Sequence, residues 1–400
     1  MFQINDIGRC CARLTAAVLL LATGGDGAAE AAPDPSADAP QWRWLFDLDL
    51  PPQPLEPAPR YETRVIFDEG IGWALSKRGA DETLRRIRQA GFNVYVPVVW
   101  HGRGAYFRSS VAHVEPRLAA VVADYDPLEY LIERAHALGI EVQPWFTVTR
   151  REDDRRPEFF DSGTPRDAYD IHRSNFRRFV VDLMTDVVRR YDVDGINLDY
   201  VRAMGVCVSD ACQRQYRDAT GGGLLLDYAE RALNVEARTR LRAWQSAAVD
   251  GVVEPLAETV RKLKPDVCIS ADVYSPDDSV PTGLEGRDPI RWLRLGWIDH
   301  AFDMQYAPVL DVAALQRFRA AQPQPAAWTP VLSNYQDATG VVTPRPTAVV
   351  VRLVRLAQTQ WRDAGVAFYL YSMLSDGQIR ALATGPFLQP SRPLPCRVPT

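Results

Sequence analysis

The chain contains very little lysine and histidine. Of its 46 basic residues only three are lysines, and the 400 residues include five histidines. The lysines (Lys77, Lys262 and Lys264) fall in polar, helix-like stretches, which does not suit enzymes that need a buried reactive amine. No HxH or HExxH pattern links the histidines, and the formal charge of −5 offers no basic surface to nucleic acid. We therefore expect no cofactor, no resident metal and no nucleic-acid partner.

Long hydrophobic runs are also missing. The longest apolar stretch near the start, 14–22, is too short to span a bilayer as a mature helix. It follows Arg9 and Arg13 and precedes small residues around Ala31 and Ala32, which is the pattern of a signal peptide with its cleavage site. We interpret residues 1–32 as a signal peptide. The mature chain is then exported to the periplasm or the extracellular space without a transmembrane helix.

The distribution of proline sets the expected domain boundaries. Residues 33–59 contain eight prolines and no periodic apolar face, as in an extended linker, and we expect this linker to be dispensable for folding. Composition is uniform over 60–385, and a second proline-rich segment, 386–400, closes the chain. The sequence thus predicts one large domain at 60–385 between a linker and a tail.

Inside that domain, short apolar runs alternate with long amphipathic stretches. The apolar runs are 64–73, 93–100, 140–148, 195–200, 267–274, 298–306, 328–334 and 366–373, and the helical stretches are 79–90, 126–138, 172–191, 235–264, 288–295, 311–321, 347–363 and 376–383. Eight strands buried on both faces, alternating with eight helices, predict an α/β fold of the (β/α)8 TIM-barrel type. A doubly wound sheet is disfavoured because no GxGxxG motif follows the first run.

The expected strand ends carry carboxylates and aromatic rings. TIM-barrel enzymes perform their chemistry at the carboxyl ends of the strands. Carboxylates there can act as acid, base or nucleophile on a glycosidic bond, while aromatic faces stack on sugar rings. We therefore expect a carbohydrate site. Its catalytic candidates are Asp199, Asp272 and Asp303, and its substrate-binding candidates are Trp100, His101, Trp145, Arg202, Gln305, Tyr306, Asn334, Tyr335 and Tyr371.

The cysteines divide into a predicted pair and a predicted core residue. Cys207 and Cys212 are five residues apart in one loop and are expected to form a disulfide in an oxidising compartment. Cys268 lies in an apolar strand-like run, where a packed core thiol is expected.

Three segments resemble the glycosyl-hydrolase-like 10 family. They are 172–202, which ends in YDVDGINLDYVR, GFNVYV at 91–96 with Trp100, and AHALGIEV at 135–142 leading to Trp145. The resemblance implies a secreted TIM barrel with glycoside hydrolase activity, in some members on peptidoglycan glycan strands. It maps the acidic residue of the fourth strand to Asp199. At Tyr200 the sequence departs from the family, since many members carry a second Asp there.

The resulting hypothesis is hydrolysis of a glycosidic bond by two carboxylates. Asp199 would be the nucleophile or the stabiliser of an oxocarbenium ion, and Asp272 or Asp303 would be the proton donor. Arg202 would orient Asp199 or meet an acidic group of the substrate. Two alternatives stay open: a non-catalytic glycan-binding barrel, and a metal-dependent polysaccharide deacetylase. The predicted partner in each case is a polysaccharide or oligosaccharide.

Overall fold

The structure, a computed structural model, describes residues 61–275, 284–324, 327–338 and 340–396. The chain divides into two compact units, and everything below concerns the larger one, residues 59–338 and 342–400. The predicted signal peptide and proline-rich linker lie outside the described residues. Within the described ranges, no helix has the length and apolar character needed to cross a membrane.

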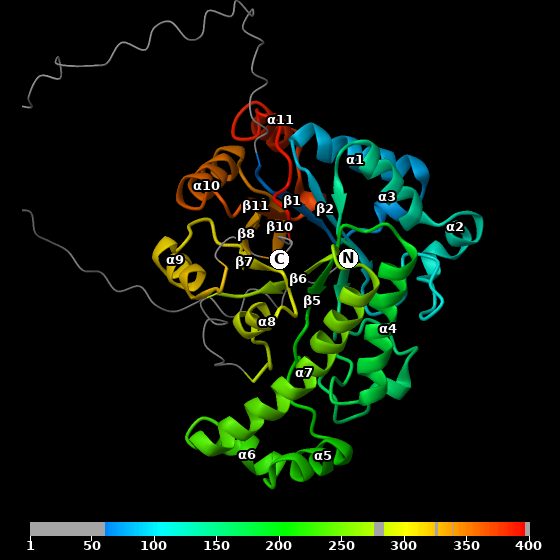
Figure 1. The fold of residues 1–400 in the computed structure, drawn as a ribbon, viewed down its shortest axis with the longest axis vertical. Coiled ribbons are helices and arrows are strands. Elements are labelled where there is room, and N and C mark those ends of the chain that lie inside the picture. Colours follow the sequence, from blue (N-terminus) through cyan, green and yellow to red (C-terminus); the bar gives the residue numbers. More distant parts are fainter. Residues whose placement is uncertain (1–60, 276–283, 325–326, 339, 397–400) are drawn as a thin grey trace, which may run out of the picture. The chain divides into compact units, whose positions relative to one another are not determined.

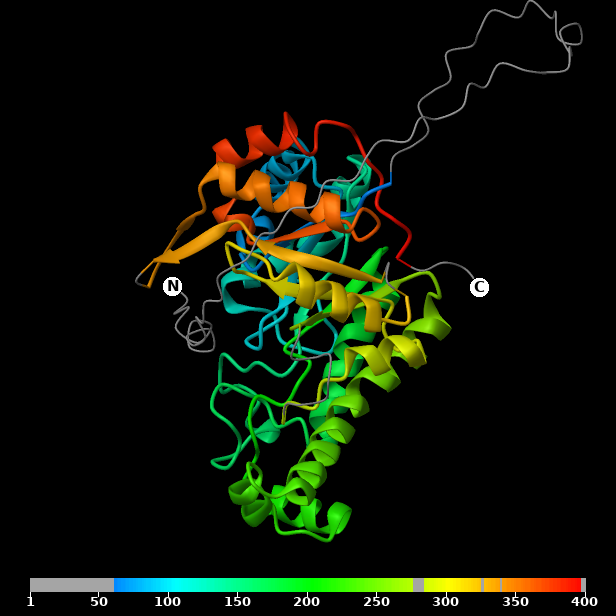
Figure 2. The same cartoon turned by 90° about the vertical axis from the view of Figure 1, so that its left-hand side faces the viewer.

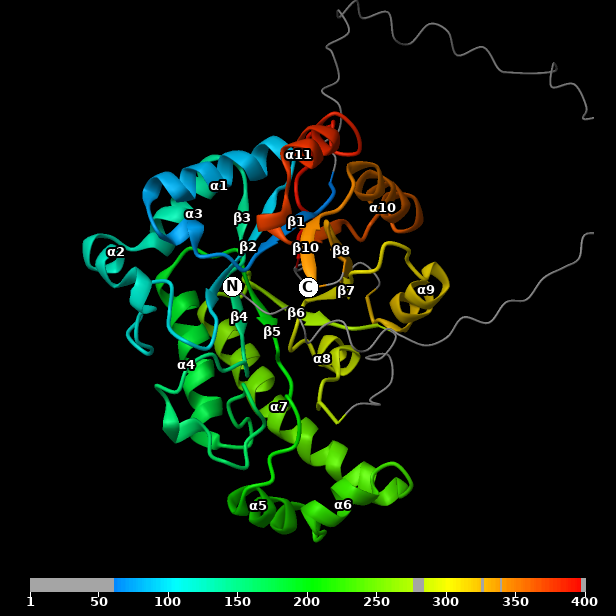
Figure 3. The same cartoon turned by 180° about the vertical axis from the view of Figure 1, so that it is seen from behind.

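The core of the larger unit is a closed parallel barrel (Figures 1 and 3). Its strands are β1 (Arg64–Asp68), β2 (Val94–Trp100), β3 (Glu141–Val142), β4 (Trp145–Thr147), β5 (Gly195–Asp199), β6 (Cys268–Val273), β7 (His300–Gln305), β8 (Trp328–Ser333) and β11 (Val366–Tyr369). The short strands β3 and β4 both pair with β2 and together form one barrel strand, so the barrel has eight. Pairing of β1 with both β2 and β11 closes it. The predicted TIM barrel is confirmed.

Eight helices follow the strands and surround the barrel (Figure 1). They are α1 (Lys77–Ala90), α3 (Pro127–Ala137), α4 (Ser174–Arg190), α7 (Val235–Leu263), α8 (Pro289–Leu295), α9 (Val312–Ala321), α10 (Thr347–Gln360) and α11 (Asp376–Ala383). The chain marks their ends locally. For example, the Asp126 side chain accepts hydrogen bonds from the first amides of α3, and Gly91 takes a left-handed conformation, φ 89°, that ends α1.

Three large rings show which strand residues face the barrel interior. Phe67 packs edge-to-face against Trp145, with ring centroids 5.8 Å apart, and against Phe302, at 5.3 Å. These residues come from β1, β4 and β7, which are not neighbours in the sheet, so the rings meet across the interior. Because side chains alternate along a strand, residues in register with these rings also point inward, and their chain neighbours point toward the helices.

Several elements lie outside the predicted alternation. They are α2 (Ala119–Asp124), α5 (Asp210–Thr220), α6 (Leu224–Glu230), the two-stranded sheet of β9 (Tyr335–Ala338) and β10 (Val341–Pro344), and 3₁₀ turns at Gly72–Ala74, Pro116–Leu118, Pro157–Phe159 and Tyr371–Met373. Helices α5 and α6 pack against α7 away from the barrel (Figures 1 and 2). They have a separate small core built around Cys207, Cys212, Tyr216, Leu224, Leu241 and Trp244.

The four cysteines of the described residues form two disulfides. Cys207 is bonded to Cys212, as the sequence predicted. Cys268 is bonded to Cys396, so the expectation of an unpaired core thiol was wrong. The separation of 128 residues gives no local signal of this pairing, which depends on where the end of the chain packs.

Residues 386–396 pack on the barrel, although the sequence placed the domain boundary at 385. Phe387 is buried against Phe92, with ring centroids 5.5 Å apart. The buried Arg64 guanidinium donates hydrogen bonds to the carbonyls of Phe387, at 3.3 Å, and Gln389, at 3.1 Å. Arg64 is the first residue of β1, so this segment covers the amino-terminal end of the barrel.

The disulfides give a direct prediction for thiol mapping. Alkylation of the unfolded, unreduced chain should leave Cys207, Cys212, Cys268 and Cys396 unmodified, because all four sulfurs are bonded. Peptide mass spectrometry before and after reduction tests this. Alkylated Cys268 and Cys396 beside an intact Cys207–Cys212 bond would show that the tail is not attached to β6.

Candidate active site

Asp199 and Asp272 lie side by side at the carboxyl end of the barrel. Asp199 ends β5, and Leu198 before it is in register with Ala271 of β6, which places Asp199 beside Asp272. Trp145 is in register with Asn197, two residues before Asp199 on the same strand. Both carboxylates therefore share the inward face with Trp145. The sequence alone predicted the strand ends, and the register brings the two acids together.

The backbone around Asp199 is held in an uncommon conformation. Tyr200, the next residue, has φ 49°, which is rare for a residue with a side chain. Its amide donates a hydrogen bond of 2.6 Å to Asp199 Oδ1. The hydroxyl of Thr149 lies 2.7 Å from the carbonyl oxygen of Tyr200 and 2.8 Å from that of Arg202, and its one hydrogen is shared between them. The turn after β5 is therefore fixed from both sides, and it fixes the Asp199 carboxylate.

The two carboxyl groups differ in their surroundings. Burial and the charge of Asp199 raise the pKa of Asp272, which is 4% exposed, well above its ordinary value. The Asn197 amide donates a 3.0 Å hydrogen bond to Asp272 Oδ1. Burial also raises the pKa of Asp199, but the Tyr200 amide and the charges of Arg202, Arg287 and His101 oppose this rise. Asp272 is thus the acid that keeps its proton longer as the pH rises.

Tyrosine rings line the barrel end beside this pair. Tyr306 of the β7 end stacks on Tyr369 of β11 at 5.4 Å, and Tyr335 contacts both rings at 6.2 and 5.9 Å. Tyr369 donates a hydrogen bond of 2.5 Å to Glu69. Trp145 forms the floor at 6.2 Å from Tyr369, and its buried indole N–H has no hydrogen-bond partner among the described residues. The wall is aromatic and carries hydroxyl groups, which suits a sugar ring.

Charged pairs border the opposite side of the site. Arg202 is bonded to Glu285 rather than to Asp199, and Arg287 holds the same Glu285 at 2.7 Å. His101 lies 2.9 Å from Glu152 through Nδ1. The structure therefore places Arg202 and His101 near Asp199, where their charges act on its pKa, while a separate carboxylate balances each of them.

Asp303 and Gln305 do not join this site. Asp303 is in register with Val273, one position away from Asp272, so it points toward the helices. It is 0% exposed and accepts hydrogen bonds from the Ser275 amide at 3.0 Å, the Gln305 amide at 2.9 Å and the Trp328 indole at 3.0 Å. The structure leaves Asp272 as the candidate donor and gives Asp303 a structural role, with Gln305 as one of its partners.

Three more predicted binding residues contact other parts of the protein and do not line the site. After an irregularity in the pairing of β2, Trp100 is in register with Phe146 and packs fully buried against Phe179 of α4 at 5.6 Å. Asn334 is also fully buried and its Oδ1 accepts a hydrogen bond from the Leu370 amide. The Tyr371 hydroxyl is bonded to Thr83 of α1. Trp145, Tyr306 and Tyr335 are the predicted aromatic residues that do reach the site.

Sequence reasoning missed several residues of the site. Glu69, Glu152, Glu285 and Arg287 were not proposed, although Glu69 lies within the apolar run predicted at 64–73. The other three lie in loops whose course no periodic pattern reveals. The tyrosine wall was found in part, because a ring at a strand end is a local signal.

Comparison with known proteins finds similarity to glycosyl hydrolases over part of the chain. Residues 160–331 match the family model of glycosyl hydrolase-like 10. This range contains Asp199 and Asp272, and the resemblance expected from the sequence is confirmed over it. Glycosyl hydrolase DigH of Escherichia coli (strain K12) is 25% identical over 228 residues, covering 48% of each chain. Glycosyl hydrolase YngK of Bacillus subtilis (strain 168) is 20% identical over 266 residues, covering 58% of this chain and 49% of the relative. The chain spans about half the length of the curated relatives it matches.

Solved structures share the fold at low sequence identity. The PgaB (BpsB) glycoside hydrolase domain from Bordetella bronchiseptica aligns with a TM-score of 0.58 at 13% identity, covering 80% of this chain and 98% of that domain. The α-L-fucosidase isoenzyme 2 from Paenibacillus thiaminolyticus aligns with a TM-score of 0.56 at 16% identity, covering 82% of this chain and 49% of that one. These similarities establish the barrel, and the glycosyl hydrolase-like family match covers β5, β6, β7 and most of β8.

Proposed function

We propose that the chain is a glycoside hydrolase whose catalytic pair is Asp272 and Asp199. The observation that carries this proposal is the pair itself: two carboxylates on adjacent strands at one level, with pKa values raised to different extents. Asp272, whose raised pKa favours its protonated form, donates a proton to the leaving oxygen. Asp199, held by the Tyr200 amide, acts as nucleophile or stabilises the positive charge that develops on the sugar.

The proposed substrate is a bacterial polysaccharide, with peptidoglycan glycan strands as the first candidate. Tyr306, Tyr335, Tyr369 and Trp145 offer stacking faces and hydrogen-bonding groups. Incubating the purified protein with peptide-free peptidoglycan glycans and other bacterial polysaccharides, with mass spectrometry of the products, tests the proposal. Absence of new reducing ends on every glycan tested would contradict it.

The pH dependence of kcat/KM is expected to be bell-shaped. Activity needs ionised Asp199, so the rate falls as the pH drops through the pKa of that group. It also needs protonated Asp272, so the rate falls as the pH rises through the higher pKa of that group. Because burial raises both pKa values, the activity maximum should lie at a higher pH than the range in which exposed carboxyl groups titrate. An Asp272→Asn variant, assayed on an aryl glycoside that needs no acid, should lose the alkaline limb, whereas persistence of that limb would contradict the assignment.

The position of the pair on adjacent strands predicts the stereochemical outcome. Neighbouring strands lie about 4.8 Å apart, whereas inverting enzymes keep their carboxyl groups roughly 6.5–9.5 Å apart to hold a water molecule between them. We expect retention of the anomeric configuration. Proton NMR during early turnover distinguishes the two anomers of the product, and initial appearance of the inverted anomer would require a different pair.

A non-catalytic glycan-binding barrel would use the same aromatic rings as a glycoside hydrolase. Only turnover of a glycan therefore distinguishes the two. The deacetylase alternative has less support from the geometry. Of the two histidines near strand ends, His101 faces Glu152 and His300 faces Thr329 at 2.9 Å. Within the described ranges, the group of side chains able to hold a metal is Asp170, His172 and Cys212, which are not strand-end residues. Activity unaffected by a chelator would argue against the deacetylase.

A further inference from the structure

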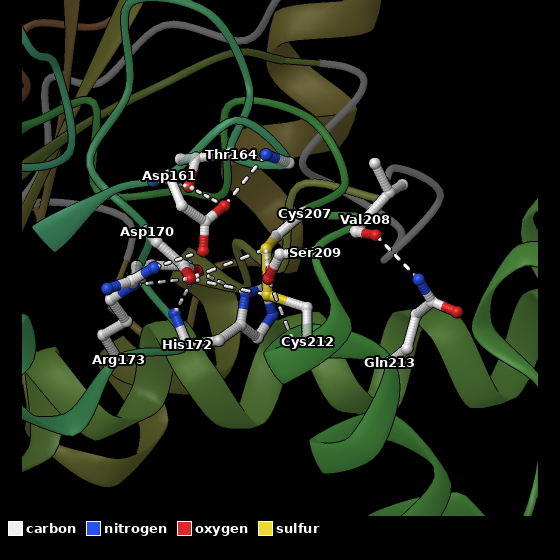
Figure 4. The surroundings of a disulfide bond; sticks show 12 residues. Asp161, Thr164, Asp170, His172, Arg173, Cys207, Val208, Ser209, Cys212 and Gln213 are labelled. Atoms are coloured by element: carbon white, nitrogen blue, oxygen red, sulfur yellow. Dashed lines mark hydrogen bonds and ion pairs between the residues drawn. A yellow bond between two sulfur atoms is a disulfide. The ribbon is translucent and has the colours of Figure 1, made fainter.

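The disulfide at the base of the α5–α6 lobe lies among side chains that bind metals. Cys207 and Cys212 are each 1% exposed, and Asp170 and His172 are also buried beside them. Figure 4 shows the Asp170 carboxylate directed at the two sulfur atoms, with the His172 ring next to it. The ligand atoms of Asp170, His172 and Cys212 lie within 4.8 Å of one another. Thiolate sulfur, imidazole nitrogen and carboxylate oxygen are all ligand types that zinc binds, and four ligands complete its tetrahedral shell.

Asp170 lies close to each of the other three residues, through Oδ2 to the sulfurs and through Oδ1 to His172. Asp170 Oδ2 lies 3.5 Å from Cys207 Sγ and 3.4 Å from Cys212 Sγ, and Asp170 Oδ1 lies 3.2 Å from His172 Nδ1. Around zinc, with bonds of about 2.3 Å to sulfur and about 2.0 Å to nitrogen and oxygen, the ligand atoms lie about 3.5 Å (S to O) and about 3.3 Å (N to O) apart. The two sulfurs are covalently bonded, so they must separate before both can bind one metal ion.

The direction of the carboxylate is poorly explained by the disulfide itself. The sulfurs of a disulfide carry no hydrogen, so they donate nothing to Asp170, which is 2% exposed. Asp170 Oδ1 accepts hydrogen bonds from the His172 amide, at 3.0 Å, and from His172 Nδ1, so the carboxylate is bonded on that side, whereas Oδ2 faces the sulfurs. Arg173 Nε, 3.3 Å from Asp170 Oδ2, compensates part of the charge and holds the carboxylate in place. A carboxylate in this position can accept hydrogen bonds from two thiols, or it can bind a cation held between the two sulfurs.

We propose that reduction of the Cys207–Cys212 disulfide opens a zinc site with Asp170, His172, Cys207 and Cys212 as ligands. A dithiol transfers two electrons and two protons to the disulfide, which gives two thiols and leaves the dithiol oxidised to a disulfide. Binding of one Zn²⁺ then releases the two thiol protons and forms two zinc–thiolate bonds. Arg173 lies outside the ligand set and orients Asp170. This inference is independent of the proposed glycosidase activity.

Cobalt provides the spectroscopic test on the full chain. After anaerobic reduction with a phosphine, Co²⁺ should bind one per chain with a thiolate-to-cobalt charge-transfer band and the visible bands of tetrahedral cobalt, and Zn²⁺ should displace it. The unreduced chain should show none of these bands. A reduced chain that lacks the charge-transfer band, or that loses its far-ultraviolet circular dichroism and so has no site, would overturn the proposal.

A second measurement needs no variant and uses the other disulfide as an internal control. In the reduced chain, Zn²⁺ should slow alkylation of Cys207 and Cys212 by at least tenfold without slowing that of Cys268 and Cys396. Equal rates at all four cysteines with and without zinc would overturn the proposal. The matched variants are C212S, which should abolish the cobalt charge-transfer band, and C396S, which should retain it.

Discussion

Replacing Asp199 with asparagine should lower kcat by a factor on the order of 10³, with a melting temperature within a few degrees of the parent chain. Asparagine keeps the volume and can still accept the Tyr200 amide hydrogen bond, but it cannot carry the negative charge. Arg202 is not left unpaired, because its guanidinium is bonded to Glu285. Steady-state kinetics on the identified glycan and a thermal melt measure the two quantities.

The matched control is Asp303→Asn on β7. Asp303 accepts hydrogen bonds from Ser275, Gln305 and Trp328 in a fully buried position. An amide there turns one acceptor into a donor that faces donors, at a cost on the order of 3 kcal/mol in unfolding free energy. We expect a lowered melting temperature and a nearly unchanged kcat per folded molecule. Near-parental activity of the folded Asp199→Asn variant would remove Asp199 from the catalytic pair.

Ending the chain at Gly385 should destabilise the barrel strongly. The deletion removes the buried Phe387 ring, two acceptors of the buried Arg64 guanidinium and the Cys268–Cys396 disulfide. By the chain-entropy estimate a disulfide closing a loop of this length contributes about 4–5 kcal/mol, and a buried Phe contributes about 3–5 kcal/mol. We therefore expect the melting temperature to fall by roughly 10 °C or more.

A full-length Cys396→Ser chain separates the disulfide from the packing in this experiment. It should lose part of the stability and keep the contacts of Arg64 and Phe387. If the chain ending at Gly385 melted within two or three degrees of the full-length protein, the tail would be peripheral to the fold, contrary to its buried contacts.

The strand and helix pattern could be predicted because each barrel unit leaves a local trace, an apolar run followed by an amphipathic stretch. Whether each strand side chain points into the barrel or toward the helices could not be predicted from the sequence. Asp303 is in register with Val273, the residue after Asp272 on β6. Asp272 therefore points inward and Asp303 points outward. The irregularity in β2 turned Trp100 away from the site in the same way. The partner of Cys268 and the course of residues 386–396 depend on contacts far apart in the chain.

The two ends of the described chain meet on the side of the barrel opposite the catalytic pair. The Glu62 amide, two residues before β1, donates a hydrogen bond of 2.9 Å to the carbonyl of Arg392, and Tyr61 forms a parallel bridge with Arg392. Ends that lie so close can be joined by a short linker and the chain reopened in a surface loop, which gives a circular permutant with the same barrel. Coupling the protein to a solid support through either end would likewise leave the barrel end that carries Asp199 and Asp272 directed away from the support.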